Sequence, residues 1–310
     1  MKLNKIYLGD CIEVLKTFPD ESINCCITSP PYFGLRDYGV DGQIGNEDTP
    51  DQYIKRLVEV FNEVNRVLKK DGVLWLNLGD SWAGSNQGSG TKNPTSKQAS
   101  NHGTNYMTTT EHKSKLSNIS GYKPKDLIGI PWMAAFALRE SGWYLRQDII
   151  WSKGNPMPES VRDRCTKSHE YIFLLSKSRK YYFDNESIKE PASTQPKARD
   201  KNKEGYQAGY SKGDRFSKGE RVYGADGMRN KRDVWNVNTK PCKEAHFATF
   251  PDTLIEPCVL AGCPEGGIVL DPFMGAGTTG MVAKRNGRNY VGIELNPQYI
   301  QIADNRINGQ

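Results

Sequence analysis

The chain has 310 residues, of which 42 are Lys or Arg and 36 are Asp or Glu, so its formal net charge is +6. Its composition, 36% hydrophobic and 25% charged, is typical of a folded protein and argues against a wholly disordered one. No apolar run approaches the roughly 18–20 residues that a membrane-spanning helix needs, and no secretory leader follows Met1. We therefore expect a cytoplasmic protein without a membrane anchor.

The charge is distributed unevenly along the chain. Residues 1–81 carry 9 basic and 13 acidic side chains, residues 82–245 carry 29 and 17, and residues 246–310 carry 4 and 6. The basic middle, with a net charge of +12, favours a polyanionic partner, although a solvated lysine-rich surface would have the same charge. The seven cysteines include no C-x-x-C pair and the four histidines have no metal-ligand spacing, so we expect most of the thiols to be buried and no metal site.

The first third of the chain alternates between short apolar runs and stretches with helical apolar spacing, which is typical of an open, mainly parallel sheet. The predicted strands are Lys5–Leu8, Ile23–Thr28 and Val73–Leu78, and the predicted helices are Cys11–Phe18 and Pro50–Leu68.

Two polar stretches interrupt the pattern, one over residues 83–125 and one over residues 185–245. Neither contains enough apolar residues to form a core, and both are net basic. Between them we predict a helix at Leu127–Glu140 and strands at Tyr144–Trp151, Tyr171–Leu175 and Lys180–Phe183. After them we predict helices at Asp252–Ala261, at Thr278–Arg285 and from Pro297 onward, and strands at Ile268–Leu270 and Tyr290–Ile293.

A glycine turn follows the predicted strand that ends at Leu270. Gly275, Gly277 and Gly280 have G-x-G-x-x-G spacing at the start of a helix, where backbone N–H groups can face a ligand. Glu294 ends the next strand, where a carboxylate can accept hydrogen bonds from the two hydroxyls of a ribose. Too little chain follows for the second half of a dinucleotide-binding fold, and a turn needed only for packing has the same pattern.

A second motif, Thr28-Ser29-Pro30-Pro31-Tyr32, directly follows the apolar strand Ile23–Thr28. Two prolines make a stiff turn that holds the Ser29 hydroxyl and the Pro30 carbonyl as fixed acceptors beside an aromatic ring. This arrangement suits a planar ring with an exocyclic amine, although a plain structural turn with Tyr32 in the core remains an alternative.

The two motifs together resemble the amino-methyltransferases that modify DNA bases with S-adenosylmethionine, and their order, with the catalytic motif first, resembles the circularly permuted β class. Further resemblance comes from Tyr7-Leu8-Gly9-Asp10-Cys11, from the segment Trp151–Ser160 followed by His169-Glu170-Tyr171, and from Arg232–Trp235 and His246–Pro251. The resemblance implies an α/β, Rossmann-like methyltransferase fold with a mostly parallel seven-stranded sheet flanked by helices.

The resemblance also implies a division of the chain. Residues 1–82 would form the catalytic half of the core, residues 126–184 would continue the core, and residues 246–310 would form the cofactor-binding half. Residues 83–125 would be a flexible polar loop, and residues 185–245 would be the target-recognition region.

Site residues follow from the same resemblance. The implied catalytic residues are Ser29, Pro30, Pro31 and Tyr32, and the implied cofactor-binding residues are Asp10, Thr28, Phe250, Asp271, Phe273, Gly275, Gly277, Thr278 and Glu294. Asp10 could instead cap a helix, and Phe273 could be a core residue. The expected DNA-binding residues are Lys153, Arg199, Arg215, Arg221, Arg229, Lys231 and Arg232, although each of the last six could instead belong to a solvated linker.

The implied reaction is methyl transfer to a base flipped out of double-stranded DNA. Serine at position 29 favours N4 of cytosine, with N6 of adenine as the alternative and a catalytically silent DNA-binding protein as a remote one. The resemblance implies a bacterial, archaeal or phage enzyme, either of the restriction-modification type or an orphan. It leaves open a homodimer and a cognate restriction endonuclease as partners.

Overall fold

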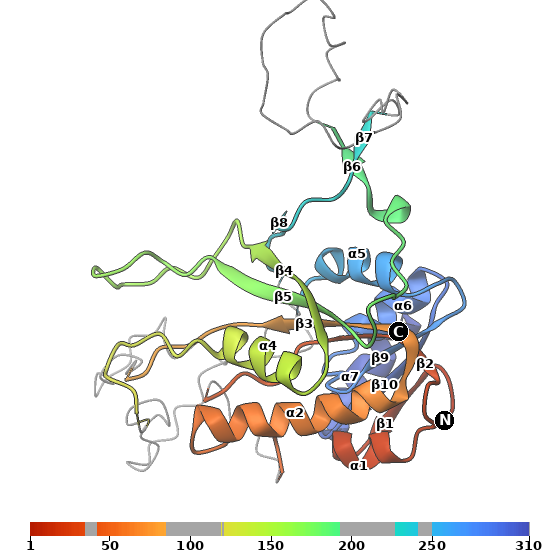
Figure 1. Cartoon of the computed structure of the whole chain (residues 1–310), viewed down its shortest axis with the longest axis horizontal. Coiled ribbons are helices and arrows are strands. Elements are labelled where there is room, and N and C mark those ends of the chain that lie inside the picture. Colours follow the sequence, from red (N-terminus) through yellow and green to blue (C-terminus); the bar gives the residue numbers. More distant parts are fainter. Residues whose placement is uncertain (35–41, 85–118, 120, 193–226, 241–249, 310) are drawn as a thin grey trace, which may run out of the picture.

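The computed structural model describes residues 1–34, 42–84, 119, 121–192, 227–240 and 250–309. One large twisted sheet runs through the centre of this part of the chain, and helices cover both of its faces (Figure 1). Among the described residues, no helix is long and apolar enough to cross a membrane.

The central sheet contains eight strands in the order β1-β10-β9-β2-β3-β5-β4-β8. Neighbouring strands are parallel from β1 to β3 and between β4 and β8, whereas β5 is antiparallel to both β3 and β4. The strands are β1 (Lys5–Leu8), β2 (Ile23–Thr28), β3 (Leu68–Leu78), β4 (Tyr144–Ser152), β5 (His169–Ser176), β8 (Val234–Asn236), β9 (Ile268–Asp271) and β10 (Asn289–Glu294).

The helices form two layers, each with its own hydrophobic core. The first layer consists of α1 (Cys11–Lys16), α2 (Pro50–Val67) and α4 (Ile130–Glu140), and the second of α5 (Asp252–Gly262), α6 (Thr278–Arg285) and α7 (Pro297–Asn308). Side chains of β2 alternate between the cores: Cys26 packs in the first, while Cys25 and Ile27 pack in the second. The prediction of a strand buried on both faces, with inert buried thiols, is therefore confirmed.

Helix α2 illustrates how local sequence sets the elements. Thr49 caps its N-terminus, with the side chain accepting a hydrogen bond from the Gln52 amide at 3.2 Å, and Pro50 occupies the first turn. An apolar stripe that includes Leu57 and Phe61 then faces the core with no exposed surface.

The predicted α/β fold class is confirmed, with one strand more than the seven expected. The additional strand is β8, a segment of three residues in the second polar stretch. It is too short to show a periodic pattern in the sequence. It pairs with β4 because Trp235 lies opposite Trp151 and is 6% exposed.

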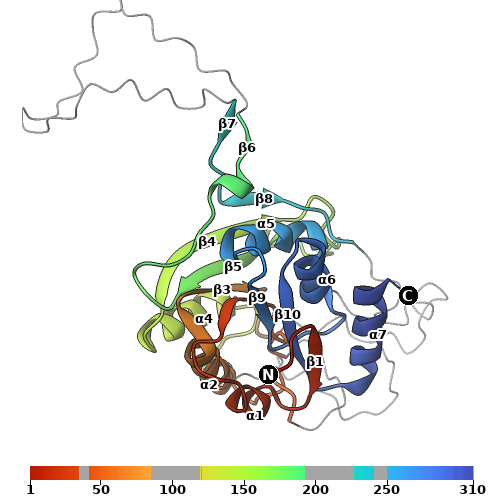
Figure 2. The same cartoon turned by 90° about the vertical axis from the view of Figure 1, so that its right-hand side faces the viewer.

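The prediction of a strand at Lys180–Phe183 is wrong. This segment has no regular secondary structure, and the Tyr182 amide donates to the Asp71 carbonyl at 2.9 Å. Its aromatic residues pack against the body instead, with the Phe183 ring stacked 6.2 Å from that of Trp75. The chain then passes through a short 3-10 helix, η2 (Glu186–Ile188), into an arm made by β6 (Glu190–Pro191) and β7 (Met228–Arg229), which projects away from the sheet (Figure 2).

Candidate active site

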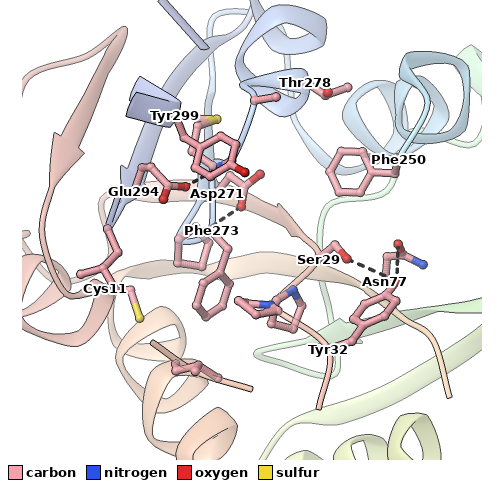
Figure 3. A pocket seen from close by; sticks show the side chains of 18 of the residues that line it. Cys11, Ser29, Tyr32, Asn77, Phe250, Asp271, Phe273, Thr278, Glu294 and Tyr299 are labelled. Atoms are coloured by element: carbon pink, nitrogen blue, oxygen red, sulfur yellow. Dashed lines mark hydrogen bonds between the residues drawn. The ribbon is translucent and has the colours of Figure 1, made fainter. Parts of the chain in front are cut away.

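A cleft with a volume of about 290 Å³ opens at the carboxyl ends of the parallel strands. Both sequence motifs reach it, because β2, β9 and β10 run in the same direction and end at the same edge of the sheet. In Figure 3, Asp271 and Glu294 lie on one side of this cleft, Ser29 and Tyr32 lie on the other, and Phe273 lies between them. We call these the glycine side and the serine side of the cleft.

On the glycine side, Asp271 is the buried centre of a hydrogen-bond cluster. Its carboxylate accepts from the Thr28 and Thr279 hydroxyls, each at 2.6 Å, and from the Phe273 amide at 3.0 Å. Burial raises the pKa of Asp271 to about 6, against the hydrogen bonds from the two threonines, which act to lower it. Because Thr28 precedes Ser29, this cluster fixes the two motifs to each other.

Glu294 lies at the end of β10, on the same side. Its two carboxylate oxygens accept from the Gly275 and Asn296 amides, each at 2.8 Å. Burial raises the pKa of this carboxyl group, and the hydrogen bonds from the backbone oppose the shift. Each oxygen keeps a further lone pair, so the group can still accept hydrogen bonds from two hydroxyls of a ligand.

The glycine turn needs residues without a β-carbon. Gly277 caps α6 in the left-handed region with φ of +79°, and a β-carbon there would lie 2.8 Å from the Ala303 side chain. Gly275 has φ of +49°. The turn is thereby held close to α7. Gly275 and Thr278 line the cleft, whereas Gly277 lies behind them and Thr28 is buried beside Asp271.

The remaining predicted cofactor residues, Phe250, Phe273 and Asp10, also line the cleft. The Asp10 carboxylate, however, caps α1 by accepting from the amides of residues 12 and 13 at 2.9 and 3.1 Å, and it forms an ion pair with Arg56 at 3.2 Å. The helix-cap interpretation of this residue is therefore confirmed, and any contact with a ligand would be additional.

On the serine side, the proline rings restrict the backbone, and contacts with neighbouring residues hold the turn in place. Pro30 is buried, and the Pro31 carbonyl accepts from the Tyr53 hydroxyl at 2.8 Å. Tyr32 lies against Gly79, where a β-carbon would approach its ring to 2.7 Å. Burial raises the pKa of the Tyr32 phenol well above its usual range, so this hydroxyl stays protonated at neutral pH.

A polar network behind Tyr32 was not predicted as a unit. The Tyr32 hydroxyl donates to Glu170 at 2.7 Å, Asn77 donates to the same carboxylate at 3.3 Å, and Lys153 forms a close ion pair with it. Lys153, which we expected to contact DNA, thus lies in the cleft with its side chain 19% exposed. The His169-Glu170-Tyr171 segment was the only sequence signal for Glu170, and nothing linked it to Asn77.

Comparison with known proteins identifies the family to which the chain belongs. A family model for N6 and N4 enzymes, described as DNA methylase, matches residues 23–305. The chain belongs to this DNA methylase family. The predicted amino-methyltransferase class and its methyl donor, S-adenosylmethionine, are therefore confirmed.

Two relatives place the chain among Type II DNA methyltransferases. It is 50% identical over 305 residues to the Type II methyltransferase M.SmaI of Serratia marcescens, covering 98% of this chain and 90% of the relative. It is 47% identical over 308 residues to M.Cfr9I of Citrobacter freundii, covering 98% and 88%.

Solved structures share the methyltransferase fold at lower identity. The PvuII DNA methyltransferase, described as cytosine-N4-specific, matches with a TM-score of 0.62 and 18% identity, covering all of this chain and 94% of its own. A DNA modification methylase from Thermus thermophilus, solved with S-adenosylmethionine, matches with a TM-score of 0.60 and 24% identity, covering 98% and 93%.

Apart from Lys153, the expected DNA-binding residues of this methyltransferase fall into two groups. Arg229, Lys231 and Arg232 surround Glu190 where the projecting arm meets the body, at 3.0, 4.0 and 3.2 Å. Although burial opposes the effect, hydrogen bonds from the two arginines lower the pKa of Glu190. The other expected residues, Arg199, Arg215 and Arg221, lie outside the described residues. Within the described part of the chain, no group of three or more His, Cys, Asp or Glu side chains is placed to hold a metal ion.

Proposed function

We propose that this methyltransferase transfers the methyl group of S-adenosylmethionine to the exocyclic N4 of cytosine, flipped out of double-stranded DNA. The observation that carries the proposal is the meeting of the two motifs in one cleft. The Ser29 hydroxyl and the Pro30 carbonyl follow β2, and the Asp271 and Glu294 carboxylates end the neighbouring parallel strands.

The glycine side suits the methyl donor by its chemistry. S-adenosylmethionine supplies a methyl group on a positively charged sulfur. Glu294 would accept hydrogen bonds from its ribose, Phe273 would pack against its adenine, and Asp271 would lie near its methionine amino group. The carboxylates add negative potential at a cationic ligand, and the glycine turn lets backbone approach it closely. Asp10, Phe250 and Thr278 remain proposed contacts because they line the same cleft.

The serine side suits an exocyclic amine. Such a nitrogen is a weak nucleophile, because its lone pair is delocalised into the aromatic ring. Hydrogen bonds from its two N–H groups to Ser29 and to the Pro30 carbonyl would favour a more tetrahedral nitrogen and aim its lone pair at the methyl group. Positioning of this kind can contribute about 7–11 kcal/mol to a barrier.

The target base must leave the duplex to enter the cleft. A base stacked and paired in DNA cannot bring its amine to the end of β2, and enzymes of this kind extrude it at a cost of a few kcal/mol. Tyr32 would stack on the flipped base, because its ring is held against Gly79 on one side and lines the cleft on the other.

Two observations favour cytosine over adenine. The first position of the catalytic motif is Ser29, which resembles the N4-cytosine enzymes of the family. A structure with the same fold is described as cytosine-N4-specific. Both amines would need the same two acceptors, so methylation of N6 of adenine is the alternative outcome.

The basic second polar stretch, residues 185–245, would recognise the DNA sequence through Arg229, Lys231 and Arg232 and the expected basic residues outside the described part. The Type II relatives support a restriction-modification role in the cytoplasm of a bacterium, with a cognate restriction endonuclease as a partner. A homodimer is a further proposal, as is the division of the chain set out above.

Single-molecule sequencing of DNA from cells that express the protein tests the proposal. We expect N4-methylcytosine at one recurring sequence, and no such signal in cells that express Ser29→Ala. Modified adenine in place of cytosine would reject the assigned base. Modification that persists in the Ser29→Ala cells would reject the assigned site.

A further inference from the structure

Among the described residues that line the cleft, Glu170 is the one carboxylate on the serine side, and the proposed function gives it no role. It lies on β5 opposite Trp151 of β4, and its side chain is 15% exposed. Three donors converge on it: the Tyr32 hydroxyl, the Asn77 amide and the Lys153 ammonium. A largely buried carboxylate that accepts from three donors indicates a role beyond packing.

The chemistry of these groups fixes the direction of each hydrogen bond. An ammonium can only donate, and an ionised carboxylate can only accept. Lys153 forms a close ion pair with one oxygen of Glu170, to which it can only donate. The other oxygen therefore has to accept from the Tyr32 hydroxyl.

The Tyr32 hydroxyl has a single proton to give. Glu170 lies at 2.7 Å from the hydroxyl and the Asn77 carbonyl oxygen at 3.3 Å, so the carboxylate takes the proton. The lone pairs of the Tyr32 oxygen are then left to accept. The Ser29 hydroxyl, 3.5 Å away, is placed to donate to it (Figure 3).

Resting on the proposed function, we propose that Glu170 is a positioning residue that makes Ser29 a hydrogen-bond acceptor. A serine hydroxyl can present either its proton or its lone pairs to a substrate, and only the lone pairs can bind an amine N–H. With the Ser29 proton directed at Tyr32, the Ser29 lone pairs are free to face the amine. The chain Ser29–Tyr32–Glu170–Lys153 thus sets the polarity of the acceptor without touching the base.

The alternative is that Glu170 only neutralises Lys153. Replacing Glu170 by Gln separates the two roles, because an amide has the same shape and one donor end. Beside Lys153 the Gln oxygen would face the ammonium, and its NH₂ group would face Tyr32. Tyr32 would then accept from residue 170, and its proton would be released toward the Asn77 carbonyl oxygen or Ser29, so the Ser29 proton would no longer be directed at Tyr32 by a fixed polarity.

The experiment measures single-turnover methyl transfer to unmethylated bacterial genomic DNA at saturating S-adenosylmethionine and DNA. We expect Glu170→Gln to slow transfer about tenfold or more, while the Kd for S-adenosylmethionine changes less than twofold. Glu63→Gln is the matched control, since Glu63 pairs with Arg66 on α2 outside the cleft and should leave the rate unchanged. An unchanged rate in Glu170→Gln would overturn the proposal.

Two further variants test the route through Tyr32. In a Tyr32→Phe background, which is itself expected to be slower, Glu170→Gln should add less than a twofold effect. Adding Lys153→Met to Glu170→Gln should recover at least fivefold, because the Gln oxygen can then turn toward Tyr32. The same loss from Glu170→Gln in both tyrosine backgrounds, or no recovery with Lys153→Met, would contradict the relay.

The readout separates this proposal from the assigned base. The rate counts methyl groups transferred to either base, so an adenine product would reject the proposed function and leave the test of Glu170 valid. If Glu170→Gln fails to bind S-adenosylmethionine, Tyr32→Phe decides alone. A loss of about tenfold supports the relay, and an unchanged rate overturns it.

Discussion

The two sides of the cleft are built in different ways. On the glycine side, Asp271 and Glu294 are held by the amides of Phe273, Gly275 and Asn296 and by the Thr279 hydroxyl, all from the C-terminal part of the chain, with the Thr28 hydroxyl as the one partner from β2. On the serine side, the Tyr32 hydroxyl bonds to Asn77 of β3 and Glu170 of β5, and Lys153 from the end of β4 pairs with Glu170 in turn. Backbone donors give a rigid site for a constant ligand, the methyl donor. On the serine side, the direction of the hydrogen bonds depends on which side chains the other strands contribute. Those side chains therefore decide whether the Ser29 hydroxyl acts as a donor or as an acceptor.

The largest expected effect is on chemistry at the serine side. Ser29→Ala removes one of the two acceptors for the amine and should lower the single-turnover rate by about 10²–10³-fold. Its Kd for S-adenosylmethionine should stay within twofold, because the glycine side is untouched. Ser22→Ala, whose hydroxyl bonds to the Pro19 carbonyl far from the cleft, should behave as wild type. Equal losses in binding and rate for Ser29→Ala would show that the two sides do not act separately.

The next effect is on stability through Asp271. Its folded pKa of about 6 lies above the unfolded value of 3.8, so the folded state binds this proton more tightly. The stability that this proton contributes is complete below pH 4 and is lost as the pH rises through 6. Urea unfolding should show that wild type loses about 3 kcal/mol more than Asp271→Asn over this range, with no further difference above pH 7. If wild type instead gained stability relative to Asp271→Asn as the pH rose, burial would not be the cause of the raised pKa.

A smaller loss is expected at the glycine turn. Gly277→Ala combines a left-handed φ with overlap against Ala303, so it should lower stability by about 2–3 kcal/mol and weaken S-adenosylmethionine binding. Gly287→Ala is the matched control. It has φ of +71° but no atom closer than 3.7 Å, so its cost should be about 1 kcal/mol. Equal melting temperatures for the two variants would argue against close packing of the turn on α7.

The smallest effect is expected on the projecting arm. The Arg232 side chain is 68% exposed, so Arg232→Ala should weaken DNA binding only severalfold. If the side chain contacts a phosphate, the slope of log K against log salt should also fall by about 1. Arg139→Ala, on α4 across the sheet from the arm, should leave the slope unchanged (Figure 1). A salt slope unaffected by Arg232→Ala would remove this residue from the DNA contacts.

The sequence predicted the glycine side well because its parts are local. A strand, a glycine turn and a helix from Ile268 to Arg285 follow one another, and the second carboxylate, Glu294, ends the next strand. Each signal lies within one continuous window, and the structure has these elements where they were predicted. Asp10 was ambiguous because a single Asp before a helix is equally a cap, and it proved to be one.

The serine side was predicted only in part. The stiff motif at Ser29 was evident, but its partners Asn77, Lys153 and Glu170 come from β3, the end of β4 and the start of β5, whose neighbourhood depends on the antiparallel insertion of β5. No local pattern reveals that order. The same gap explains two of the errors in the elements: the segment Lys180–Phe183, predicted as a strand, pairs with no strand of the sheet, and β8 was missed because its pairing with β4 lies outside any local pattern.

The most direct test of the account is to follow the methyl group itself. Purified enzyme would be incubated with S-adenosylmethionine carrying a deuterated methyl group and unmethylated bacterial genomic DNA, and the DNA would be digested to nucleosides for mass spectrometry. The account predicts deuterated N4-methyldeoxycytidine from the wild type and almost none from Ser29→Ala. Deuterated N6-methyldeoxyadenosine without any N4-methyldeoxycytidine would contradict it.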